Sequence, residues 1–245
     1  ILRRIAGKHF FEHRSMSSYT TKNDAVSETR RLVEQWWADV REKGDKEILI
    51  EGVEKGDNNS PEQARKLLEK YPDAALDALV KGVTNATQWR TRSQLVGITG
   101  QVKGDGTVPF LLREMKEGLF LSSRVAAAWQ LHRRYNKDAA PAMIEEWNKI
   151  GEKEDKHSDD DSRGGEWLVE FLVVCDKPQA IAALGKDLSK RRVDVRLSIV
   201  KELHDNVPYM SPFSMELRAS TADSAEETLG ADTQEAAEDL LGSLL

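Results

Sequence analysis

The sequence lacks the features that mark several common classes of protein. Its single cysteine, Cys175, excludes an intrachain disulfide and lies in an apolar run that predicts a core position. No run approaches the ~18 apolar residues that a membrane-spanning helix needs, so no membrane association through such a helix is expected. A phosphate-binding loop, a Gly-x-Ser-x-Gly elbow and a Gly-x-Gly-x-x-Gly pattern are also missing. We therefore predict neither a cofactor nor a catalytic centre.

Positive charge is scarcer than negative charge. The net charge is −6, the pI is about 5.5 and the mean hydropathy of −0.57 is that of a well-solvated chain. From Asp205 onward nine acidic residues stand against Arg218 alone, a net charge of −8 that leaves +2 for the rest of the chain. Because no basic stripe is present, nucleic acid is not predicted as the main partner.

Only seven prolines occur, and four of them recur at regular intervals. Pro72, Pro109, Pro141 and Pro178 are 37, 32 and 37 residues apart, and each stands before an apolar stripe. Proline is favoured in the first turn of a helix because its missing N–H costs nothing there. Four helices are therefore predicted to begin at these positions.

The first 70 residues show helical patterns without this regular spacing. A long helix is predicted to end at Gly44, and its adjacent Trp36 and Trp37 point about 100° apart, so at most one is expected to reach solvent. Ser60 and Gln63 are predicted to form the capping box of a later helix. These helices are interpreted as degenerate repeats.

Each proline-led helix is followed by a partner helix, and both carry apolar residues at helical spacing. The predicted stripes of the proline-led helices are Leu76, Leu79 and Val80; Leu111, Leu112 and Met115; Met143, Ile144 and Trp147; and Ile181, Leu184 and Leu188. Those of the partner helices are Leu95, Ile98 and Val102; Val125, Ala128, Trp129 and His132; Trp167, Leu168, Phe171, Leu172 and Cys175; and Leu197, Val200 and Leu203.

Three partner helices also carry an arginine near their start. Arg92, Arg124 and Arg196 are predicted to form salt bridges or carbonyl contacts between neighbouring repeats, with contact to a partner as the less favoured role. A pair of helices cannot bury both of its faces and must stack on its neighbours. The predicted fold is an all-α, right-handed α-solenoid of stacked helical hairpins. Its expected divisions are residues 1–70 (degenerate repeats), 71–206 (regular repeats) and 207–245 (acidic tail).

The stretches Ser-Arg-Val-Ala-Ala-Ala-Trp-Gln-Leu at 123–131 and Asp-Val-Arg-Leu at 194–197, together with the proline-led helices, resemble HEAT-like repeats. The likeness is to the phycobilisome-lyase type common in bacterial repeat proteins, and it covers roughly residues 71–206. The third unit departs from the pattern, because Gly164 and Gly165 precede Trp167 and no arginine stands there. The resemblance implies an ARM/HEAT-like α-α superhelix and a tendency to bind proteins.

Enzymes of HEAT-like architecture place further demands on the sequence. Iron-binding hydroxylases of this class use His-Glu dipeptides, and none of the five histidines is followed by glutamate, which excludes that class. DNA glycosylases need a basic groove with aromatic residues and a carboxylate. Trp129, Trp147 and Trp167 instead have the helical spacing of core residues. A lyase or a DNA glycosylase with its site in the groove remains the alternative to a non-catalytic function.

Two acidic segments raise hypotheses of their own. Residues 155–166 place oxygen ligands as an EF-hand loop does, but Asp160 occupies the sixth position, where the turn needs glycine, so a solvated loop is favoured over a calcium site. The tail after residue 206 could occupy the groove of the solenoid, with Tyr209, Met210 and Phe213 as anchors.

The predicted function is a non-catalytic scaffold for protein–protein interaction. The partner is expected to be a protein or peptide that binds the concave surface formed by the partner helices. The chain begins at Ile1 rather than Met, as a fragment or a processed product would, so no compartment is predicted. The candidate partner-binding residues are Gln94, Gln130, Arg133, Arg134 and Lys201.

Overall fold

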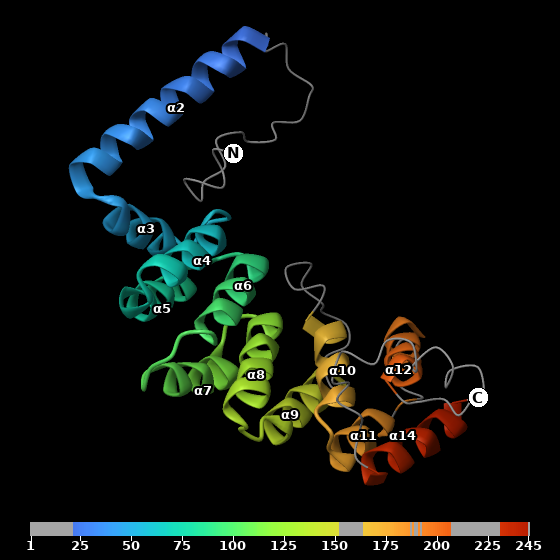
Figure 1. Cartoon of the computed structure of the whole chain (residues 1–245). Helices are drawn as coiled ribbons and strands as arrows, with labels where there is room; N and C mark the ends of the chain where they lie inside the picture. The colour runs from blue at the N-terminus through green and yellow to red at the C-terminus, as the bar shows by residue number, and fades with distance from the viewer. Residues whose placement is uncertain are drawn as a thin grey trace, which may run out of the picture. The chain divides into compact units, whose positions relative to one another are not determined.

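The computed structural model describes residues 22–151, 164–186, 188, 191, 193–206 and 231–244. Within these residues the regular structure is entirely helical, which confirms the predicted all-α class (Figure 1). None of the helices described there is long and apolar enough to cross a membrane. The chain divides into two compact units, Ile1–Leu111 and Leu112–Leu245.

The first unit is built from helices that pack on their neighbours along the chain. Helix α2 lies against α3, α3 packs on α4 and α5, and α6 covers α4 and α5. The elements are α2 (Lys22–Lys43), α3 (Asp45–Glu54), α4 (Ser60–Lys70), the 3-10 turn η1 (Pro72–Ala74), α5 (Ala75–Asn85) and α6 (Trp89–Thr99). Their buried apolar side chains include Leu49, Val53, Leu67, Leu79, Val83, Leu95, Val96 and Ile98.

The two adjacent tryptophans of α2 have opposite environments. Trp36 is 6% exposed and packs with Leu32, Val33 and neighbouring apolar residues, whereas Trp37 is 48% exposed. Their rings nevertheless touch, with centroids 4.8 Å apart. The expectation that at most one of them reaches solvent is confirmed.

Helices α3 and α5 approach so closely that only glycine fits between them. A Cβ atom on Gly82 would lie 2.4 Å from the backbone oxygen of Val53. Gly56, just after α3, has a φ of +65°, and a Cβ there would lie 2.6 Å from the backbone nitrogen of Ala86. The contact is closed by the side-chain amide of Asn85, which donates to the Glu54 carbonyl at 2.7 Å. Two glycines therefore set the distance between the helices.

The predicted capping box at the start of α4 is wrong. Ser60 is the first helical residue, and its hydroxyl donates to the Gly52 carbonyl at 2.7 Å instead of capping its own helix. Asp57 shapes the turn by accepting from the backbone N–H of Asn59 at 2.8 Å and of Ser60 at 3.2 Å. Gln63 lies over Gly52, and its Oε1 is buried without a hydrogen-bond partner in the described part of the chain. Packing between α3 and α4 has replaced the local cap.

The second unit repeats the pattern of neighbouring contacts. Helix α10 packs on α8, α9, α11 and α12, and α9 also packs on α11. The boundary with the first unit falls inside α7. The helices are α7 (Thr107–Glu117), α8 (Leu121–Tyr135), α9 (Ala140–Gly151), α10 (Gly164–Val174), α11 (Pro178–Gly185), α12 (Val193–Asn206) and α14 (Ala231–Leu244).

The four helix starts predicted from the spaced prolines are confirmed. Pro72 begins η1 before α5, Pro109 and Pro141 lie in the first turns of α7 and α9, and Pro178 begins α11. The stripes are buried in most places, but Leu112 is 37% exposed and Leu197 is 62% exposed.

The error at Leu197 has a simple geometric cause. The predicted stripe joined Leu197, Val200 and Leu203 by steps of three, which drift around a helix with 3.6 residues per turn. Among the side chains of α12 that the structure describes, Ile199 and Leu203, four residues apart, are buried.

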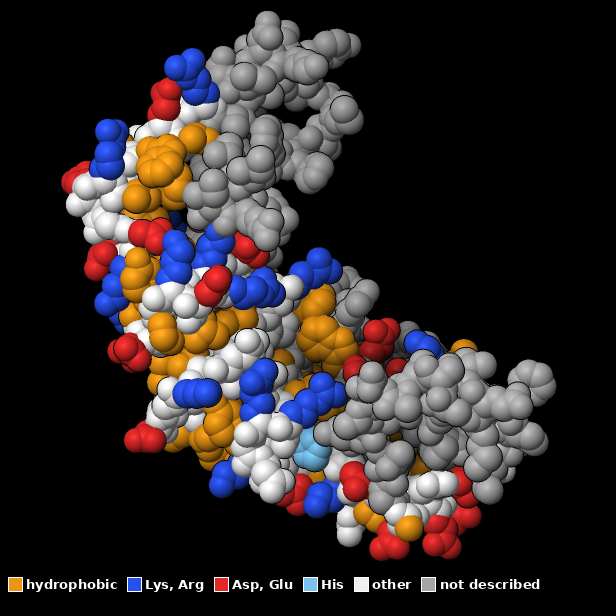
Figure 2. Space-filling model, in the orientation of Figure 1, with side chains coloured by type: hydrophobic (Ala, Val, Ile, Leu, Met, Phe, Trp, Pro, Cys, Tyr) orange, Lys and Arg blue, Asp and Glu red, His pale blue; other side chains and the backbone are white. Residues whose placement is uncertain are grey.

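Helix α14 packs on α11 and α12. Ala237 and Leu241 are buried, and Leu240 lies so close to Gly185 that a Cβ there would be 2.9 Å from its Cδ1. The opposite side of α14 is acidic and exposed, and Figure 2 shows red side chains over this helix. Helix α14 therefore has an apolar side against α11 and α12 and a charged side exposed to solvent.

The glycine contact between α3 and α5 can be tested against a matched helical glycine. Gly82→Ala is expected to destabilise the protein by about 1–3 kcal/mol, because overpacking against a backbone oxygen outweighs the gain of about 1 kcal/mol in helix propensity. Gly97→Ala in α6, where no atom lies within 4 Å of the added Cβ, is expected to stabilise it by up to about 1 kcal/mol. Urea unfolding of both variants checks this, and equal stabilisation by both would contradict the close approach.

Candidate functional site

Arginines near the start of two second helices make the same contact. Arg92 in α6 donates from Nη1 to the carbonyl of Val83 in α5, at 2.9 Å. Arg124 in α8 donates from Nη1 to the carbonyl of Gly118, just after α7, at 2.8 Å. The last carbonyls of a helix lack partners in their own helix and carry partial negative charge. Each arginine therefore closes its own hairpin.

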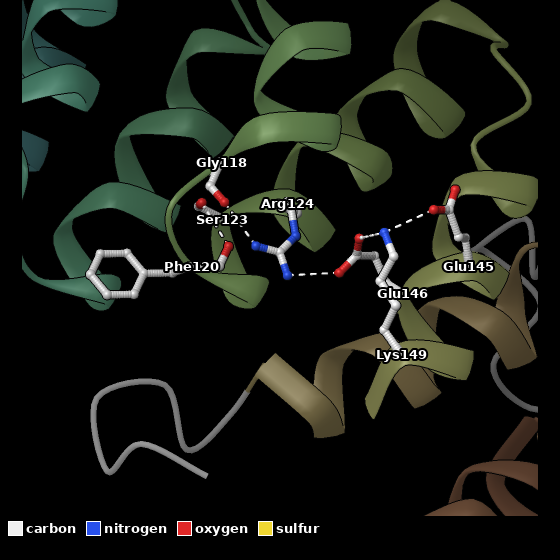
Figure 3. Close-up of polar contacts among 7 residues, drawn as sticks. All are labelled: Gly118, Phe120, Ser123, Arg124, Glu145, Glu146 and Lys149. Carbon is white, nitrogen blue, oxygen red and sulfur yellow. Dashed lines mark hydrogen bonds and ion pairs between the residues drawn. The ribbon is translucent and has the colours of Figure 1, made fainter. Parts of the chain in front are cut away.

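The contact of Arg124 extends to the next hairpin (Figure 3). Its Nη2 lies 2.7 Å from Glu146 Oε2 on α9, in a pair whose side chains are only 20% and 12% exposed. Lys149 Nζ lies 3.0 Å from Glu146 Oε1 and 2.8 Å from Glu145 Oε1. The predicted salt bridge between neighbouring repeats is thus present at Arg124, and the predicted carbonyl contact lies within the hairpin.

Arg196, the third arginine of the predicted series, does not repeat this contact among the described residues. Its Nε is buried and has no hydrogen-bond partner there. Its neighbours along the chain include residues 192 and 194, of whose side chains nothing is described. Among the described residues, this contact is therefore made by Arg92 and Arg124.

Three of the predicted partner-binding residues lie together near the end of α8. We call Trp129, Gln130, Arg133 and Arg134 the α8 patch. The Cζ atom of Arg133 lies 4.1 Å from the centroid of the Trp129 ring, and Arg134 Nε donates to Gln130 Oε1 at 3.1 Å. The half-buried Trp129 ring meets buried Phe171 of α10 edge-on, with centroids 5.1 Å apart. The patch combines a positioned indole with two exposed guanidinium groups.

The other two predicted residues lie elsewhere. Lys201 is exposed on α12 in the same unit, and Gln94 is exposed on α6 in the first unit. The prediction missed Trp129 as a surface residue, although its spacing of four from Arg133 indicates a stacked pair on one helix face.

A second stacked pair has a structural role that the sequence did not indicate. The guanidinium of Arg191 lies 4.3 Å from the centroid of the Trp147 ring, and its Nη2 donates to the Trp147 carbonyl at 3.3 Å. Trp147 Nε1 in turn donates to the carbonyl of Ala183 in α11 at 2.9 Å. Both side chains are buried, so they tie α9 to the segment around α11.

No group of three or more His, Cys, Asp or Glu residues that could hold a metal ion occurs in the described ranges. The candidate calcium loop at 155–166 lies outside the described residues except for its end in α10. The proposed tail anchors Tyr209, Met210 and Phe213 also lie outside them.

Cys175 is a core residue, as the sequence predicted. The side chain is 1% exposed, and burial raises the pKa of its thiol to about 11.

At pH 8 the alkylation of Cys175 by iodoacetamide is expected to be at least about a hundredfold slower in the folded chain than in the urea-unfolded chain, because a pKa two units higher lowers the thiolate fraction about a hundredfold. Because the pKa of the thiol is higher in the folded chain than in the unfolded chain, the protein keeps its full free energy of unfolding below about pH 9. It loses stability as the pH rises from there towards 11. Equal labelling of folded and unfolded chains would contradict burial.

The Arg124 contact is expected to be a larger stabilising element than an exposed pair of similar geometry. Arg124→Gln should cost about 2 kcal/mol, because it leaves the Gly118 carbonyl without its donor and the nearly buried Glu146 with Lys149 as its remaining cation. Arg30→Gln is the control, since Arg30 and Glu34 are 2.8 Å apart, close to the 2.7 Å of the Arg124–Glu146 pair, but their side chains are 80% and 64% exposed. This variant should leave the unfolding midpoint unchanged. Equal effects in urea unfolding would count against the role given to burial.

Comparisons with known proteins identify no relative of this chain. No family model matches it, and no curated protein or solved structure matches it either.

Proposed function

We propose that this chain is a non-catalytic protein–protein interaction scaffold, a right-handed solenoid of HEAT-like hairpins. The observation that carries the proposal is the equivalent contact of Arg92 and Arg124 at the ends of successive first helices. One residue in one role at one position of the hairpin is what tandem repeats require. Repeats of this kind present equivalent helix faces to an extended partner.

The second helices supply the surface that this scaffold would use. Arg133, Arg134, Gln94 and Lys201 are exposed on three of these helices, and none of them is needed for the apolar core. Tryptophan and arginine are enriched among residues that dominate binding energy at protein interfaces. The α8 patch has both, which makes it the favoured centre of the binding surface.

The enzyme alternatives, a lyase or a DNA glycosylase, are less well supported. A glycosylase site would need a carboxylate beside the aromatic and basic residues. The described ring contacts of Trp129 are instead with Phe171 and Arg133. Trp147 is buried, its ring contacts the Arg191 guanidinium, and its Nε1 donates to the Ala183 carbonyl.

Photocrosslinking in the cells that make the protein would test the proposed function. A benzophenone amino acid at Gln130, in the α8 patch, is expected to crosslink to a discrete protein partner. The same amino acid at Asn148, an exposed polar position on the first helix α9, should not. Excess unlabelled wild-type protein should compete the crosslink away. Crosslinks at both positions alike, or at Asn148 only, would refute binding through the second helices.

A further inference from the structure

We propose that the α8 patch binds an acidic peptide segment of the partner through its Asp and Glu carboxylates. This inference rests on the proposed function and specifies the chemistry of the partner. Its basis is that Arg133 and Arg134 are exposed and that no ion pair among the described residues involves either of them. Arg124 and Lys149 in the same unit, in contrast, have carboxylates within 3.0 Å.

The position of Arg133 over the Trp129 ring suits its guanidinium group to bind a carboxylate. A guanidinium that lies on an indole uses its π face, so its N–H donors, which lie in the plane of the group, remain for an acceptor. A carboxylate matches this fork with two parallel hydrogen bonds. The Trp129 ring is itself held by Phe171, so the donor pair is positioned before a partner arrives.

The positive charge at the end of α8 has a second explanation besides peptide binding. His132, Arg133 and Arg134 stand in the last turn of α8, where cations offset the helix dipole. The dipole needs only positive charge, whereas the proposal needs a planar donor group at Arg133. A substitution that keeps the charge but removes the plane distinguishes the two roles.

The length and charge of the partner follow from the patch. Two arginines provide too few cations for a nucleic acid, whose binding rests on neutralising many phosphates, and the chain as a whole carries −6. A short peptide with a few carboxylates and one apolar residue fits better, because the half-buried Trp129 offers an apolar surface beside the arginines.

Fluorescence anisotropy with labelled synthetic peptides tests this partner chemistry on the full chain. The probe is a Glu-rich peptide containing one Leu, and the matched probes replace Glu by Gln or by phosphoserine. The Glu peptide is expected to bind wild-type protein, more weakly as salt rises. Arg133→Gln combined with Arg134→Gln should weaken binding roughly tenfold or more, and Arg133→Lys alone should lose a large part of it. The control Lys116→Gln with Lys186→Gln removes equal charge at exposed positions outside the patch and should have no effect.

Several outcomes would overturn the proposal. These are equal binding of the Glu and Gln peptides, binding of the phosphoserine peptide alone, unchanged binding after Arg133→Lys, or equal loss in the control variant. A crosslink at Gln130 in cells with no Glu-peptide binding would leave the proposed function standing and refute the acidic partner. Glu-peptide binding without any crosslink at Gln130 would leave the affinity of the patch for acidic peptides standing and refute the proposed function.

Discussion

Two packed helices bury only the faces that they turn toward each other, so each hairpin leaves an apolar side that a neighbour must cover. Helix α10 shows the result, because Leu168, Phe171 and Leu172 are fully buried where α8, α9, α11 and α12 surround it. Burial of each such side chain contributes roughly 1.5–3 kcal/mol, against an ordering cost of similar size for each residue with its backbone. Stability within each unit therefore depends on contacts between hairpins.

Polar contacts act on this apolar framework by fixing the ends of hairpins. Arg92 and Arg124 donate to carbonyl groups at the ends of α5 and α7, and Glu146 links Arg124 to the next hairpin. Glycine has a related role where backbones meet, as Gly82 shows against Val53. These contacts are short and specific, so they set the register of helices that apolar packing alone would leave less defined.

The same side-chain pair serves two purposes in the second unit. Arg191 on Trp147 and Arg133 on Trp129 have similar stacking distances, 4.3 and 4.1 Å. The first pair is buried and all its described hydrogen bonds go to backbone carbonyls, so it holds helices together. The second is on the surface, where the guanidinium of Arg133 remains exposed. Location, and not residue type, separates a structural pair from a candidate binding pair.

The sequence by itself determined the helical class, the helix starts at the prolines and the limit that at most one of Trp36 and Trp37 reaches solvent. Each follows from local geometry: the φ angle of proline, the missing N–H and the turn angle of a helix. The α8 patch was also within reach, because Gln130, Arg133 and Arg134 share one helix. Only the tertiary structure decided that Leu197 is exposed, that Ser60 bonds to Gly52 and that Arg191 stacks on Trp147. Those outcomes depend on how neighbouring helices cross, which brings together residues such as Trp147 and Arg191, 44 positions apart, and has no counterpart in local periodicity.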